Sequence, residues 1–144
     1  MKIIKIIGHP VLVMSMFLLV IISGQHFGGF YLLYILMGLP NGAPHALIAL
    51  TGLITLFIGY KIYRSKPHVF KPILYVIGVL IMSYALLTFF ENSQGYNNAT
   101  FYQTVPLISL IIYGTCSLCC LIYAFWLIAK IYRSKAANLG ITSR

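Results

Sequence analysis

Three cysteines fall close together in the stretch "TCSLCC" near the end of the chain. Cys116 and Cys119 have the C-x-x-C spacing of dithiol redox sites, in which two thiols form and break a disulfide. They lie in the middle of a long apolar run, too deep to exchange with aqueous partners. Small residues let helices approach closely in lipid, so we expect Cys116, Cys119 and Cys120 to pack rather than to react.

The same predicted helix carries small and aromatic residues in alternating steps of four and three, the spacing of one helix face. The stripe consists of Ser109, Tyr113, Cys116, Cys120 and Tyr123. Two other predicted helices offer small residues for the same role, and these are Ala49, Gly52, Gly59 and Gly78. The pattern predicts helix–helix packing positions.

Two histidines flank an apolar segment before the second long run. His26 and His45 are neutral imidazoles that could hold a haem iron. Bound histidines normally need a second-shell carboxylate or carbonyl, and no carboxylate is close in the sequence. The alternative is that both are hydrated side chains beside a turn. We therefore expect no metal and no cofactor, with haem kept as an alternative.

The composition indicates a membrane protein. Of the 144 residues, 60% are hydrophobic and 8% are charged, against about 25% charged in a soluble domain. No Asp, Glu, Lys or Arg occurs inside the apolar runs of residues 10–23, 44–60, 72–90 and 105–128. Coupled transporters and voltage sensors keep such charges, and acid–base hydrolysis needs carboxylates. The sequence argues against these classes and predicts a protein that is not an enzyme.

Four apolar runs predict an all-α integral membrane protein with a single transmembrane domain over residues 1–144. The expected helices, most of them near the required length of about 20 residues, cover residues 5–24, 44–62, 71–90 and 105–130. The first run needs the apolar residues before Pro10 to reach that length. Prolines near the helix starts suit a first turn, where the missing N–H has no partner to lose.

The basic residues predict the threading. All ten lie in three groups, within residues 2–5, 61–71 and 130–144, and the single acid, Glu91, lies outside them. Short basic loops stay in the cytoplasm, so an even number of crossings separates successive groups. The expected helices then form two antiparallel hairpins with both termini cytoplasmic. Residues 27–39 are too short to cross and are predicted to be a re-entrant or interfacial half-helix, with residues 91–104 as a polar outer loop.

The hexamer "KIYRSK" closes the second and the fourth predicted helix. Its cationic and tyrosine side chains suit the headgroup region, where they anchor helix ends. The expected anchors are Lys61, Tyr63, Arg64, Lys66, Lys130, Tyr132, Arg133 and Lys135. The repeat is also compatible with a parallel duplication of the hairpin, or with two independent stop signals. The net charge of +9 lies in short flanks rather than on a polar face, which argues against nucleic-acid binding.

A C-x-x-C pair on the last of four membrane helices is similar to the vitamin K epoxide reductase family. The resemblance covers residues 116–119 and the number of helices. It implies thiol redox activity, but that family also needs a second cysteine pair in an outer loop. This chain has three cysteines in all, so the resemblance does not extend to the electron relay.

Three functions fit these features. The first is a scaffold or accessory subunit that packs with other membrane proteins or with itself in the lipid bilayer. The second is a passive pore or facilitator for a small solute or a lipid, in which the apolar half-helix lines the path. The third is a haem- or quinone-binding electron-transfer subunit. The first is our main expectation, with a bacterial inner (plasma) membrane as the location.

Overall fold

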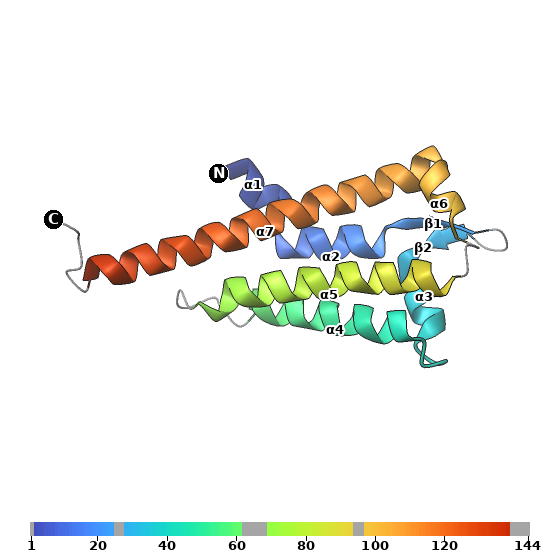
Figure 1. The fold of residues 1–144 in the computed structure, drawn as a ribbon, viewed down its shortest axis with the longest axis horizontal. Coiled ribbons are helices and arrows are strands. Elements are labelled where there is room, and N and C mark those ends of the chain that lie inside the picture. Colours follow the sequence, from blue (N-terminus) through green and yellow to red (C-terminus); the bar gives the residue numbers. More distant parts are fainter. Residues whose placement is uncertain (1, 25–27, 62–68, 94–96, 139–144) are drawn as a thin grey trace.

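The computed structural model describes residues 2–24, 28–61, 69–93 and 97–138. It is mostly helical, with one short antiparallel sheet (Figure 1). In chain order the elements are α1 (Lys2–Ile7), α2 (Pro10–Leu18), β1 (Ile21–Ser23), β2 (Gly28–Phe30), α3 (Tyr31–Gly38), α4 (Pro44–Lys61), α5 (Phe70–Asn92), α6 (Ala99–Tyr102) and α7 (Thr104–Asn138). Within the described residues three helices, α4, α5 and α7, are long and apolar enough to cross a membrane. This confirms the expectation of a helical membrane protein.

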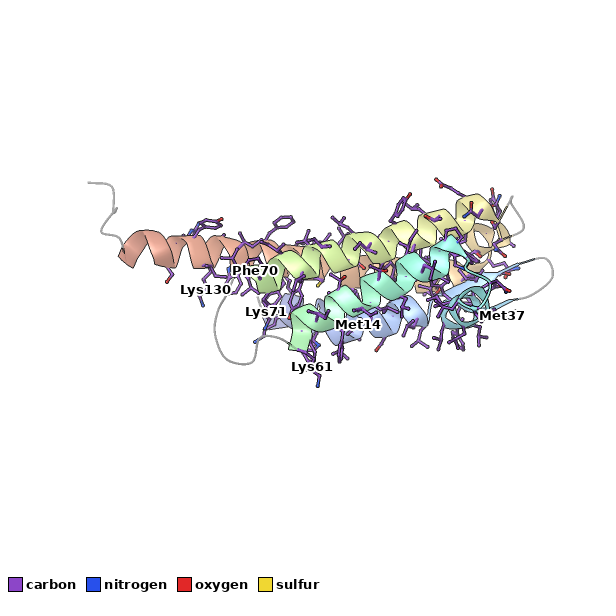
Figure 2. All side chains as sticks on the ribbon, turned by 90° about the horizontal axis from the view of Figure 1, so that it is seen from below. Met14, Met37, Lys61, Phe70, Lys71 and Lys130 are labelled. Carbon is purple, nitrogen blue, oxygen red and sulfur yellow. The ribbon has the colours of Figure 1, made fainter. Side chains whose placement is uncertain are left out.

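The molecule is elongated, and α2, α4, α5 and α7 run along its length (Figure 1). We call one end the hairpin end, because β1, β2, α3 and α6 gather there. We call the other the basic end, where Lys61 and Lys71 lie, with Lys130 further out along α7 (Figure 2). Met37 marks the hairpin end in the same view. The C-terminal part of α7 continues past α4 and α5 (Figure 1).

The expected continuous helix over residues 5–24 is wrong. The chain forms α1, breaks at Gly8 and His9, and starts again as α2 with Pro10 in its first turn. Proline has no N–H to donate and pushes the residue before it out of the helical region. His9 accordingly has extended backbone angles, φ −68° and ψ 130°.

The same segment ends in a strand instead of a helix, because α2 stops at Leu18 and β1 follows. Three successive β-branched residues, Val20, Ile21 and Ile22, favour extended backbone. β1 pairs with β2 in antiparallel register, with Ile22 opposite Gly29. The hairpin is an addition to the all-α fold expected from the sequence.

The other boundaries differ less. The half-helix expected over residues 27–39 begins as β2 and becomes helical only at Tyr31. The expected outer loop over residues 91–104 contains the end of α5, the short helix α6 and the first residue of α7. Expected helices over residues 44–62 and 71–90 correspond closely to α4 and α5. The last one, expected over residues 105–130, continues as α7 to Asn138.

The most extensive helix contact joins α4 to α5. In the expected arrangement these helices belong to different helical hairpins. The pair with the most extensive contact therefore joins the first half of the chain to the second half. The halves are also built differently. In the first half, α2 and β1 lead through β2 and α3 to α4. In the second half, α5, a helix of 23 residues, leads through the short α6 to α7.

Candidate functional site

The β1–β2 hairpin is tied to the last helices by two hydroxyl groups. The N–H of Ile21 donates to Ser109 Oγ at 2.9 Å, and the N–H of Ser23 donates to Thr100 Oγ1 at 2.9 Å. Thr100 also donates to the Ser23 carbonyl at 3.3 Å, and Ser109 donates to the Pro106 carbonyl at 2.7 Å. Extended backbone at membrane depth needs partners of this kind, because lipid offers none. Ser109, expected only as a packing position, is a hydrogen-bond partner of the strand.

Tyr31 is the centre of a buried aromatic cluster at the hairpin end. Its ring makes edge contacts with Phe17, 5.2 Å away between centroids, and with Phe89, 5.3 Å away. Its hydroxyl donates to the Ala85 carbonyl on α5 at 3.2 Å. Burial raises the pKa of the Tyr31 phenol, so the hydroxyl stays neutral and keeps this donor role. The cluster joins α2, α3 and α5 at one point.

His45 lies at the start of α4 and packs against the same cluster. Its ring is 5.0 Å from Phe89, and a hydrogen bond links it to the backbone of Tyr34. Its Nε2 is buried without a hydrogen-bond partner among the described residues. A Cβ added at Gly38 would lie 3.2 Å from this nitrogen, so α3 passes close to it. His26, the other proposed haem ligand, lies outside the described residues.

The expected packing glycines lie in the contact between α4 and α5. A Cβ at Gly52 would meet Met82 Cγ at 2.7 Å, and a Cβ at Gly78 would meet Leu56 Cβ at 2.9 Å. Each glycine thus makes room for a large side chain from the facing helix. Leu56 and Met82 each follow a glycine of their own helix by four residues, which is about one helical turn. Gly59 faces Tyr75 in the same contact. Ala49 is fully buried on the same helix, α4.

The cysteines lie where α7 is crossed by the break between α1 and α2. A Cβ at Gly8 would lie 2.6 Å from the backbone of Cys119 and Cys120, so the backbone at Gly8 contacts the backbone of α7 directly. Cys116 and Cys120 are buried, and Cys119 is half-buried. All three are free thiols. Gly8 was not expected to be a packing residue, because the sequence predicted a continuous helix through it.

The two tyrosines of the α7 stripe have different neighbours. The hydroxyl of Tyr113 forms a 3.1 Å hydrogen bond with Ser83 on α5, and its ring lies 5.5 Å from Phe17. Tyr123 stacks on Trp126 of its own helix, with 6.1 Å between centroids. Tyr113 therefore joins α7 to α5 and α2, while Tyr123 supports the part of α7 nearest the basic end.

Three lysines at or beyond the basic end lie over aromatic rings of their own helices. Nζ of Lys61 is 5.7 Å from the Phe57 ring, and Nζ of Lys130 is 5.3 Å from the Trp126 ring. Lys71 lies over Tyr75 in the same way, at 5.9 Å. Tyr132 and Arg133 are exposed on α7. The remaining expected anchors lie outside the described residues or have undescribed side chains, and these are Tyr63, Arg64, Lys66 and Lys135.

Comparison with known proteins adds no assignment. Searches against protein-family models, curated proteins and solved structures returned no significant match to this chain. The function of this chain is therefore inferred from its sequence and geometry alone.

Several polar groups of the described residues are used within the fold. In the described part of the chain, no three His, Cys, Asp or Glu side chains come together as metal ligands would. The polar groups of the hairpin end, Ser109, Thr100 and Tyr31, are engaged with backbone atoms of neighbouring elements. What the arrangement provides is a set of fixed contacts between elements that are distant in the sequence.

Proposed function

We propose that the chain is a non-catalytic scaffold or accessory subunit of a membrane, packing with another membrane protein or with a second copy of itself. The observation that carries the proposal is the length of α7. The candidate span Thr104–Ser134 has 31 residues. At about 1.5 Å per residue it is roughly 46 Å long, whereas a hydrocarbon core is about 30 Å thick.

The C-terminal part of α7 carries apolar side chains that this chain leaves uncovered. Ile122, Phe125 and Trp126 are all exposed. Gly8 touches α7 at Cys119 and Cys120, and the His9 ring lies 5.4 Å from Tyr60 near the end of α4. Ala124 is fully buried and Tyr123 packs against the core, so one face of this segment still contacts the bundle while the face of Ile122, Phe125 and Trp126 is uncovered. Exposed aromatic side chains on a helix face are typical anchors of a protein contact.

We also propose that the chain crosses the membrane four times, the first time through α2 and β1. The nine residues of α2 at about 1.5 Å each, followed by residues 20–23 at up to about 3.3 Å each, give roughly 27 Å, close to the thickness of a hydrocarbon core. A helix followed by a strand can thus match a bilayer that the helix alone is too short to cross. In this arrangement the basic end faces the cytoplasm, in agreement with the positive-inside rule.

The hairpin contacts favour a scaffold over a facilitator. A facilitator offers free backbone groups to its solute along the path. The N–H groups of Ile21 and Ser23 are instead used by Ser109 and Thr100. The strand is thereby fixed as part of the bundle.

Site-specific photo-crosslinking in native membranes tests this proposal. A photoreactive phenylalanine analogue replaces Phe125 on α7, and the matched control carries it in place of Leu87, which is equally exposed on α5. We expect a protein adduct of defined mass from position 125 and lipid adducts alone from position 87. Twice the chain mass identifies a second copy, and any other mass identifies a different subunit. Lipid adducts alone at both positions, with a monomer in mild detergent, would refute the proposal.

A further inference from the structure

Lys61 and Lys71 lie at the end of α4 and the start of α5, the two helices with the most extensive contact in the described residues. Their ammonium groups lie over Phe57 and Tyr75, each one helical turn further from the helix end. The Tyr75 ring also touches α4, since a Cβ at Gly59 would lie 3.1 Å from its Cδ1 atom. The two lysines are therefore carried by one rigid pair of helices, and Figure 2 shows both at the basic end.

No acidic side chain of this protein can neutralise these lysines. The sequence contains one acid, Glu91. It lies 20 residues beyond Lys71 near the other end of α5, a separation of about 30 Å. Lys71 also lies in the first turn of α5, where the helix dipole disfavours a cation. An anion from outside the chain would offset both effects.

Apolar side chains close to each lysine along its own helix are uncovered. Phe70 is 70% exposed, and Phe57 and Ile73 are also exposed. A soluble anion would gain nothing from these side chains. An anionic glycerophospholipid matches both parts of the surface, because its phosphate meets the ammonium groups and its acyl chains cover the rings.

We propose that Lys61 and Lys71 form a binding site for the phosphate of an anionic glycerophospholipid, with its acyl chains against Phe57 and Phe70. The aromatic rings hold the ammonium groups in place before the lipid arrives, which lowers the entropy cost of binding. The site is independent of the scaffold function proposed above.

Native mass spectrometry of the full chain in a neutral detergent tests the site by titration with phosphatidylglycerol. The double variant Lys61→Gln/Lys71→Gln is compared with Lys2→Gln/Lys5→Gln, which removes the same charge from α1. One lysine near an anionic surface contributes about a factor of five, so we expect roughly 30-fold weaker binding for the first variant and nearly unchanged binding for the second. Equal weakening in both variants would mean that net charge, not a site, attracts the lipid, and would overturn the proposal.

Two further experiments identify the ligand and check that weaker binding is not caused by misfolding. Phosphatidylcholine and inorganic phosphate replace phosphatidylglycerol in parallel titrations, and we expect binding of neither in the same concentration range. Inorganic phosphate that competes with the lipid at equal concentration would show a soluble-anion site and contradict the proposal. The variant Lys61→Arg/Lys71→Arg keeps the charge and should retain binding within a few-fold. Loss of binding in this folded variant would also overturn the assignment.

Discussion

Replacing Gly78 by alanine should weaken the contact between α4 and α5. The added Cβ would lie 2.9 Å from Leu56 Cβ and 3.0 Å from Leu56 N, where ordinary contact begins at 3.4 Å. The helices must then move apart by about half an ångström. Trimming Leu56 to alanine would not relieve the clash, because Cβ and N remain.

Gly114→Ala is the matched control, since Gly114 lies inside α7 and an added Cβ would meet no atom of the described residues within 4 Å. Both substitutions gain up to about 1 kcal/mol of helix propensity. Overpacking costs Gly78→Ala a further amount of about 1–3 kcal/mol. The free energy of unfolding of Gly78→Ala should therefore lie about 1–3 kcal/mol below that of Gly114→Ala.

Unfolding of the full chain in mixed micelles, followed by circular dichroism as a denaturing detergent is added, measures this difference. Wild type should fall between the two variants or close to Gly114→Ala. Equal unfolding free energies for the two variants would refute the close approach of α4 and α5. A lower value for Gly114→Ala would instead place the tight contact on α7.

Three more outcomes are expected. Ser109→Ala leaves a half-buried N–H of β1 without its acceptor and should lower the unfolding free energy by about 1–3 kcal/mol. Thr115→Ala loses only a bond within its own helix and should change the unfolding free energy by less than about 0.5 kcal/mol. Tyr31→Phe removes the bond to the α5 carbonyl and should cost about 0.5–1.5 kcal/mol in the same assay, and no loss would contradict the role of this hydroxyl. A membrane-impermeant thiol reagent added from outside should label Asn97→Cys but not Lys5→Cys, with the wild-type chain as blank; labelling of both from one side would contradict four crossings.

The long helices could be predicted because their signals are local. Lys61 follows the apolar run of α4, and Pro72 lies in the first turn of α5. Hydropathy and these end signals fix a helix within a few residues. The end of α7 lies beyond the predicted end, because the lysines and the arginine of the basic hexamer mark a membrane boundary and are also good helix formers.

The first segment could not be predicted in the same way. Hydropathy alone does not separate a helix from a strand in a short apolar run, so Val20 and Ile21 were assigned to a helix. The choice between the two depends on partners elsewhere in the chain. The acceptor of the Ile21 N–H is Ser109, 88 residues later, and that of the Ser23 N–H is Thr100, 77 residues later. No local pattern contains such a pairing.

The candidate site was predicted in part. The glycines of the α4–α5 contact follow from their spacing, because Gly52 and Gly59 lie on one face of a helix. The partners of those glycines, and the contact of Gly8 with α7, depend on how the helices are arranged in space. Spacing along one helix does not determine that arrangement.

The ties between β1 and α7 also bear on the order in which the protein is assembled. Ile21 leaves the ribosome long before Ser109, yet its N–H needs that side chain as an acceptor. During synthesis the early segment must wait in the translocon or at the membrane surface, since lipid cannot serve its unpaired backbone. The last helix to be inserted therefore completes the first part of the chain, and a nascent protein truncated before α7 should be recognised by quality control as unfinished.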